Sequence, residues 1–278
     1  MKAVGLTIVG LLSISALANG QVIPIVPRID SGPAPHIRPE ASQLDPVILT
    51  YLATLTPAGG LDSARSLGER SVQLNKSTYA GAPAWEIVET RGTGAIASVD
   101  TLITDFTSLA PFHWGASQPL PGSIATSAKL AVEFKGDSMI GVLTAQSGRR
   151  TILGSFPSGS YFTAGQIETA LRSLPIGAAG WHDSATLVVT DPSRSTVVPA
   201  ALAVRGEDHL LTMAGTYDCW VVVLSTDVGQ TQYWVSKSDR IVVKSSQIVP
   251  ETGDLLQYTL TRVSHSPVSK TPAKKHKG

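Results

Sequence analysis

From about residue 70 onward, apolar and polar positions alternate along the chain with a period of two. Within residues 129–134, Leu130, Val132 and Phe134 share one face, and residues 256–260 alternate in the same way. This pattern is typical of antiparallel strands with one buried and one solvated face. Further strands are predicted near residues 72–75, 83–90, 99–106, 138–144, 185–190, 200–204, 231–236 and 240–246.

Two segments show helical spacing instead. Residues 44–55 are predicted to form a helix with Asp45 as N-cap and Pro46 at the first helical position, because apolar residues recur there at i, i+3 and i+4. A second helix is predicted after Thr163, which has the spacing of a capping box with Gln166. The whole pattern predicts a mainly β (α+β) protein, in which one or two helices pack on an antiparallel sheet.

The start of the chain has the pattern of a secretory signal. A short basic start precedes an apolar run that ends at Leu17, and Ala16 and Ala18 fit a cleavage site, with the cut after Ala18 or after Gly20. The run is too short for the roughly 20 apolar residues of a membrane span. We therefore expect a signal peptide over residues 1–18, export to the periplasm or the extracellular space, and no transmembrane span after cleavage.

Three further regions are predicted. Residues 19–46 are rich in proline, which fixes φ and removes backbone donors, so we expect an extended arm. Residues 47–264 are expected to form a single β-rich domain. Residues 265–278 contain four lysines and no acidic residue, and are expected to be a disordered basic tail. This tail is either a solvated terminus or an attachment to an anionic surface of the cell envelope.

The composition argues against several classes of function. Only 15% of the residues are charged and the formal net charge is +1, so the strongly basic balance of a nucleic-acid-binding protein is absent. Lys2 and the four tail lysines account for five of the 22 basic residues, so the body is mildly acidic. The single cysteine, Cys219, cannot form an intrachain disulfide. Its apolar surroundings predict a central strand and a buried, unreactive thiol.

The sequence has no pattern that assigns a metal or another cofactor. None of the six histidines has the spacing of a zinc site. Residues 136–139 (Gly-Asp-Ser-Met) are similar to the nucleophile block of one esterase family, but their place between two predicted strands favours a hairpin turn. The sequence therefore assigns no catalytic residue. An envelope hydrolase using Ser138 or Ser184 with His182 or His209 is kept as an alternative.

Aromatic residues are the other candidates for a binding site. By default they are core residues, but some of them can instead line an apolar ligand groove on the concave face of a curved sheet. The candidate ligand-binding residues are Trp85, Phe112, Trp114, Phe134 and Trp234.

Three strand-like segments, with a similar earlier hairpin, carry a family resemblance: residues 215–223, 232–237 and 240–244, and residues 100–111. They resemble an uncharacterised family of exported bacterial proteins, which is itself similar to the periplasmic lipoprotein-carrier half-barrels. The resemblance covers roughly residues 70–263. It implies a curved antiparallel sheet that wraps around helices as a half-barrel, and no catalytic residues. Analogy of fold further suggests a cavity for acyl chains.

The leading hypothesis is an exported, non-catalytic half-barrel that binds a lipid or another apolar ligand, or that docks an envelope partner. The aromatic content and the lack of a recognisable catalytic constellation in the sequence favour it. The alternatives are the envelope hydrolase and a structural envelope component that attaches through the basic tail.

Overall fold

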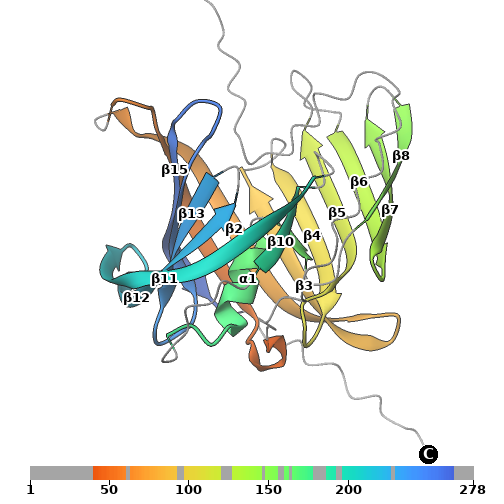
Figure 1. The fold of residues 1–278 in the computed structure, drawn as a ribbon, viewed down its shortest axis with the longest axis horizontal. Coiled ribbons are helices and arrows are strands. Elements are labelled where there is room, and N and C mark those ends of the chain that lie inside the picture. The colour runs from red at the N-terminus through yellow and green to blue at the C-terminus, as the bar shows by residue number, and fades with distance from the viewer. Residues whose placement is uncertain are drawn as a thin grey trace, which may run out of the picture.

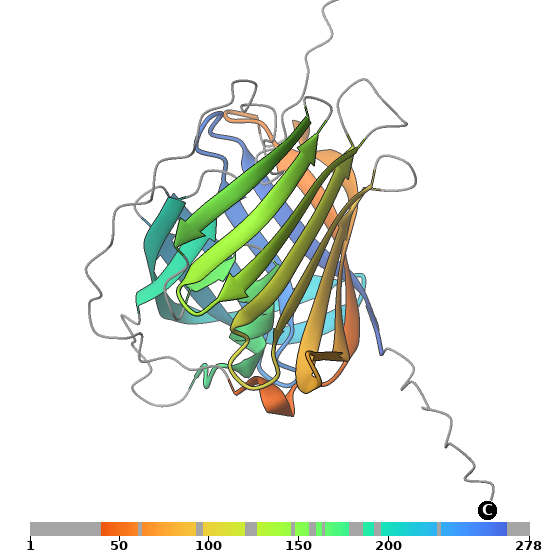
Figure 2. The same cartoon turned by 90° about the vertical axis from the view of Figure 1, so that its right-hand side faces the viewer.

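The computed structural model shows one β-sheet that bends into a half-barrel around a short helix (Figures 1 and 2). It describes residues 40–60, 63–92, 97–119, 127–145, 148–155, 160–162, 165–177, 186–191, 196–226 and 229–265. The expected signal peptide, most of the proline-rich arm and nearly all of the basic tail lie outside these residues. Within them, no helix has the length and the hydropathy that a membrane span requires.

The first half of the sheet is a run of antiparallel hairpins. Its strands are β1 (Val47–Thr56), β2 (Arg65–Tyr79), β3 (Ala82–Arg91), β4 (Ser98–Asp105), β5 (Pro111–Pro119), β6 (Ser127–Lys135), β7 (Ser138–Ala145) and β8 (Gly148–Ser155). The predicted alternation is confirmed in β6, where Leu130, Val132 and Phe134 are buried, while Lys129 and Glu133 are exposed. One face of each strand therefore contributes to the core.

The second half contains the helix and the remaining strands. These elements are β9 (Ser160–Phe162), α1 (Gly165–Ser173), β10 (Thr186–Asp191), β11 (Thr196–Thr212), β12 (Gly215–Thr226), β13 (Gly229–Ser236), β14 (Val242–Ile248) and β15 (Leu255–Ser264). β9 pairs with β10 in parallel, and every other pair in the sheet is antiparallel.

The two halves join through the first and the last strand. β1 pairs with β15, with Tyr51 opposite Leu260 and Leu55 opposite Leu256. The order in space is therefore β8 to β1, then β15 to β9, in a 15-stranded sheet. Consecutive strands β8 and β9 form its two opposite edges. The twist of a large antiparallel sheet curves it, and the half-barrel implied by the family resemblance is confirmed.

The helix predicted over residues 44–55 is wrong, because β1 occupies most of this segment. Its inward positions alternate, and each is at most 6% exposed: Val47, Leu49, Tyr51, Ala53 and Leu55. Ile48 and Leu52 complete an apparent helical stripe in the sequence, but both are half-buried positions between the inward ones. Pairing with strands on both sides outweighs the local helical pattern, as tertiary context commonly does.

The second predicted helix is confirmed as α1, although Thr163 lies outside the described residues. Residues 165–171 are all buried, and the helix packs mainly against β3, β9, β14 and the short 3₁₀ helix η2 (Ala41–Gln43), inside the curve of the sheet (Figure 1). Beyond its end, Gly177 has a φ of +85° and packs under the ring of Trp220. The helix is therefore part of the core.

The last residues of the expected arm, 40–46, pack onto this core. Ala41 is fully buried, and its carbonyl accepts a hydrogen bond from Nε1 of Trp85 at 3.1 Å. Its backbone N–H donates to the carbonyl of Thr107 at 2.9 Å. The segment before β1 is thus fixed to β3 and to the turn between β4 and β5.

Besides β1, three strands are missing from the sequence-based prediction: β5, β8 and β9. β5 begins and ends with proline, and its pairing with β4 shifts between Ile103 and Thr104. A bulge of this kind interrupts the alternation that identifies a strand. β8 begins with Gly-Arg-Arg, and β9 has only three residues, so neither shows a clear apolar period.

Candidate functional site

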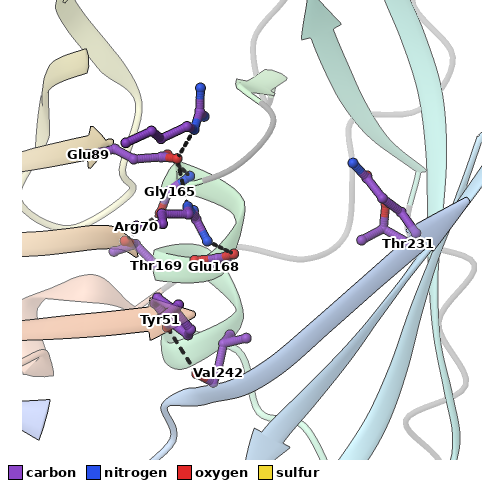
Figure 3. A network of polar contacts seen from close by, with 10 residues as sticks. Tyr51, Arg70, Glu89, Gly165, Glu168, Thr169, Thr231 and Val242 are labelled. Carbon is purple, nitrogen blue, oxygen red and sulfur yellow. Dashed lines mark hydrogen bonds and ion pairs between the residues drawn. The ribbon is translucent and has the colours of Figure 1, made fainter. Parts of the chain in front are cut away.

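Arg70 is the centre of a buried ionic cluster on the concave face of the sheet (Figure 3). It occupies an inward position of β2, next to Val72 in the alternation, and is 2% exposed. Its Nε lies 2.6 Å from Oε1 of Glu89 on β3, and its Nη1 lies 2.7 Å from Oε1 of Glu168 on α1. The arginine therefore links the sheet to the helix.

Glu89 receives several donors at once. Nε of Arg91 lies 2.6 Å from its Oε1, and the backbone N–H of Gly165, the first residue of α1, donates to its Oε2 at 3.1 Å. Burial by itself raises the pKa of Glu89, but the charges of Arg70 and Arg91 outweigh burial and lower the pKa to about 2. The carboxylate is therefore ionised near neutral pH and anchors the N-terminus of the helix.

Aromatic rings enclose the other side of the cluster. The guanidinium carbon of Arg70 lies 4.8 Å from the ring centroid of Tyr258 and 5.4 Å from that of Tyr51. The hydroxyl of Tyr51 donates to the carbonyl of Val242 on β14 at 3.0 Å, and burial raises the pKa of this hydroxyl well above its usual value. These contacts fix the arginine between the two halves of the sheet.

Asp100 on β4 lies at the border of the cluster. Its Oδ2 lies 3.7 Å from Nη1 of Arg91. Burial raises the pKa of Asp100 to about 6, and the opposing attraction of Arg91 only reduces this shift. The side chain therefore changes charge at a pH well above that of an exposed aspartate.

A small cavity lies beside the cluster, between α1 and strands β1, β2 and β14. Its volume is about 10 Å³, and it is lined by Val47, Leu49, Val72, Leu74, Glu168, Thr169, Arg172 and Val242. Among the described residues, Oε2 of Glu168 and Nε of Arg172 are buried without a hydrogen-bond partner. A cavity of this size has room for one water molecule. This cavity is too small for an organic ligand, and the contacts of Arg70 join the sheet to the helix.

The same buried core extends along the concave side of β5 to β8 as a layer of apolar side chains. We call it the inner wall; its residues are each at most 8% exposed and are Trp114, Leu130, Val132, Phe134, Met139, Leu143 and Ile152. The register places them side by side, with Trp114 opposite Val132 and Phe134 opposite Met139. Because α1 packs mainly against η2, β3, β9 and β14, the inner wall lies beyond the main contacts of the helix.

The five aromatic residues predicted to bind a ligand divide between different surroundings. Trp114 and Phe134 belong to the inner wall. Trp85 also faces inward, on β3, but its ring stacks on Phe106 at 5.0 Å and its Nε1 donates to two backbone carbonyls, those of Ala41 and Phe106. It is therefore a core residue that attaches η2 and the β4–β5 turn.

Phe112 and Trp234 lie apart from the inner wall. Phe112 is at the bulge of β5, where its ring stacks on Tyr79 with 5.2 Å between the centroids. Nε1 of Trp234 donates to Oδ2 of the exposed Asp208 at 2.8 Å, and Nζ of Lys244 lies 4.8 Å from the Trp234 ring. Phe112 therefore packs on another aromatic ring, whereas Trp234 has polar and charged partners.

Sequence reasoning missed two polar residues on the concave side. Gln118 on β5 and Arg150 on β8 occupy inward positions, two residues from Ala116 and Ile152 respectively. Within the described part of the chain, Oε1 of Gln118 and both Nη atoms of Arg150 are buried and have no hydrogen-bond partner. In the sequence, the spacing of two residues between Arg150 and Ile152 indicates that Arg150 shares a strand face with an apolar residue.

The residues of the alternative hydrolase are only partly described. Ser138 is an exposed residue at the start of β7. Nδ1 of His209, on β11, lies 2.7 Å from Oδ1 of Asp218, and both side chains are largely exposed. His182 and Ser184 lie outside the described residues. Among the residues that are described, no group of three or more His, Cys, Asp and Glu side chains could hold a metal ion.

Comparison with known proteins identifies solved structures that have a similar fold. No protein-family model and no curated protein matches the sequence. A β-barrel-like protein of the domain of unknown function DUF1849 from Brucella abortus superposes with a TM-score of 0.51 and 13% identity, over 81% of this chain and 99% of the other. A DUF1329 family protein from Desulfovibrio piger (TM-score 0.29, 8% identity, 81% and 87% covered) and the hypothetical lipoprotein YmcC from Escherichia coli (0.25, 9%, 82% and 90%) are more distant. The chain therefore shares its fold with the β-barrel-like protein from Brucella abortus, an uncharacterised bacterial protein, in agreement with the resemblance in its sequence.

Proposed function

We propose that this protein is an exported, non-catalytic carrier that binds an apolar ligand, such as an acyl chain, against the inner wall. The observation that carries the proposal is the inner wall itself, where four neighbouring strands, β5 to β8, place apolar side chains on the concave side of the sheet. Binding sites for small apolar molecules are concave and are lined mainly by apolar and aromatic side chains.

An open edge of the sheet supports access to this wall. Among the described strands, β8 lies at an edge of the sheet and pairs with β7 alone. Ile152 on β8, with Met139 and Leu143 on β7, forms the part of the inner wall closest to that edge. Edge elements with fewer hydrogen bonds and contacts open at a lower free energy than central ones. A ligand can therefore reach the wall past β8 while the interior strands stay paired.

Export is the second part of the proposal, and the apolar run before Ala18 supports it. Expression of the full chain, followed by fractionation and N-terminal sequencing, tests it directly. A mature protein that begins at Asn19 or Gln21 in the envelope or the medium is the expected result. An uncleaved chain in the cytoplasm contradicts this part.

The binding test compares two adjacent residues of β8 that face opposite sides. Ile152→Gln places an amide on the inner wall, whereas Leu153→Gln changes a side chain that is 61% exposed. Energy transfer from tryptophan to a dansyl-labelled acyl chain without a charged head reports binding. We expect about tenfold weaker binding for Ile152→Gln, because apolar contact is lost. Leu153→Gln should bind like the wild type.

Thermal unfolding shows whether each variant is folded, and Ile152→Thr replaces Ile152→Gln if the latter is not. Trp114→Phe should reduce the energy transfer, since Trp114 lies in the inner wall, and Trp234→Phe is the control on the other face. The proposal is overturned if the wild type shows no saturable binding, or if the Ile152 and Leu153 variants bind the probe equally well.

A further inference from the structure

We infer that the ligand carries an anionic head group, a carboxylate or a phosphate, and that Arg150 binds it. This inference rests on the proposed function. Arg150 lies on β8 opposite Leu143 of β7, which lies opposite Leu130 of β6. It alternates with Ile152 and therefore shares the concave face with the inner wall.

The guanidinium of Arg150 has no partner in the described part of the chain. Its Nη1 and Nη2 atoms are both buried, and neither makes a hydrogen bond. β7 and β8 contain no acidic residue, and the acid of β6, Glu133, is exposed, with Tyr79 and His113 as its partners. Arginine stays protonated in proteins, and an unpaired buried charge is costly. A ligand anion would satisfy this charge.

Two other arginines on the concave face show the pairing that Arg150 lacks. Arg70 and Arg91 each have Nε at 2.6 Å from a carboxylate oxygen of Glu89. A guanidinium binds a carboxylate or a phosphate through parallel N–H···O bonds, which makes it the preferred side chain for planar anionic groups. In Arg150, the two terminal nitrogens that make such a pair of bonds are the ones without a partner.

The row of inward residues gives the ligand a direction. From Arg150 the row passes through Leu143, Leu130 and Ala116 to Asp100 on β4. Four strand spacings make this row roughly 19 Å long. Asp100 at the far end disfavours an anion, whereas Arg150 lies on the edge strand. The head group therefore lies at the β8 edge, and the apolar tail follows the inner wall.

Three ligands with alkyl tails of the same length and different head groups distinguish binding of the head group from binding of the tail. They are dodecanoate, dodecyl phosphate and dodecanol. Their binding to the full chain is measured by calorimetry for the wild type, Arg150→Met and Arg149→Met. Arg149 is the exposed neighbour of Arg150 and serves as the control. We expect Arg150→Met to weaken the tighter-binding anion by about tenfold or more and to leave dodecanol unchanged. Arg149→Met should leave all three unchanged.

The outcomes distinguish the inference about Arg150 from the proposed function on which it rests. If Arg150→Met binds both anions as tightly as the wild type while dodecanol also binds, the inference is overturned and the proposed function stands. If the wild type binds none of the three ligands, both are overturned. A preference for dodecanoate indicates a fatty acid, and a preference for dodecyl phosphate indicates a phospholipid.

Stability without ligand provides a second measurement. Because Arg150→Met removes an unpaired buried charge and keeps an apolar stem, its melting temperature should equal or exceed that of the wild type. A clear decrease would show that the protein itself provides a partner for Arg150, and would overturn the inference.

Discussion

Nε of Arg70 lies 2.6 Å from Oε1 of Glu89, and both side chains are at most 5% exposed. The same carboxylate also binds Arg91 and the first N–H of α1. One residue of β3 therefore pairs with two cations and positions the helix. Because Arg70 and Glu89 are both buried, the loss of the carboxylate would leave an uncompensated charge in the core.

Glu89→Gln should destabilise the protein by about 3–5 kcal/mol, since it breaks a buried ion pair on one side only. Glu86→Gln is the matched control, because Glu86 lies on the same strand and accepts a part-buried hydrogen bond from Asn75. It should cost no more than about 1 kcal/mol. The free energy of unfolding in urea measures both, and equal values for the two variants would contradict the role of Glu89.

Asp100 should make stability fall as the pH rises from about 4 to about 6. Burial raises its pKa in the folded protein to about 6, above the value of about 3.9 in an unfolded chain, so the folded state binds the proton more tightly in this range. Relative to the wild type, Asp100→Asn should therefore gain stability between pH 4 and pH 7.5, on the order of 3 kcal/mol. Urea unfolding at both pH values checks this. A constant difference would show that Asp100 titrates normally.

Gly177→Ala should destabilise the protein more than Gly81→Ala. Both glycines have a φ of +85°, but a Cβ at Gly177 would lie 2.4 Å from ring atoms of Trp220, whereas nothing lies within 4 Å at Gly81. Backbone strain alone costs roughly 1–2 kcal/mol, and the steric clash adds about 1–3 kcal/mol. Trp220→Leu should remove part of the extra cost of Gly177→Ala. The close packing is disproved if the two alanine variants are equally stable.

Cys219 should not react with a thiol reagent at pH 8 while the protein is folded. It is fully buried, as predicted from its apolar strand, and burial raises the pKa of the thiol to about 11, with a further contribution from Asp208. The thiolate is the reactive form, so both access and ionisation oppose the reaction. Labelling with and without urea measures this, and rapid stoichiometric labelling of the folded chain would refute it.

Much of the sheet could be predicted because a period of two survives in most strands. The pattern in β6 and β15 was clear, and α1 was found from its helical spacing. β1 was predicted as a helix because apolar residues occupy both of its faces, which happens in a strand with neighbours on both sides. The local sequence does not contain the information that β15 pairs there.

The ionic cluster could not be predicted from the sequence. Arg70 is 19 residues from Glu89 and 98 residues from Glu168. Each looks like an ordinary charged residue, and only the position of α1 inside the sheet buries them together. The aromatic candidates Phe112 and Trp234 were easy to select from the sequence, but their surroundings were not predictable. Phe112 lies at a bulge of β5, and Trp234 lies next to Asp208 and Lys244.

The placement of β8 and β9 at opposite edges has a consequence for how the chain could be rearranged. The hydroxyl of Thr261 on β15 donates to the carbonyl of Thr50 on β1, across 211 residues, so the ends of the domain meet in the middle of the sheet. A circular permutant that joins Ser264 to Val47 through a short linker and opens the chain between Ser155 and Ser160 would have its strands in the same order in sequence and in space. Its strand pairings would all join consecutive strands. Chains rich in local contacts fold faster.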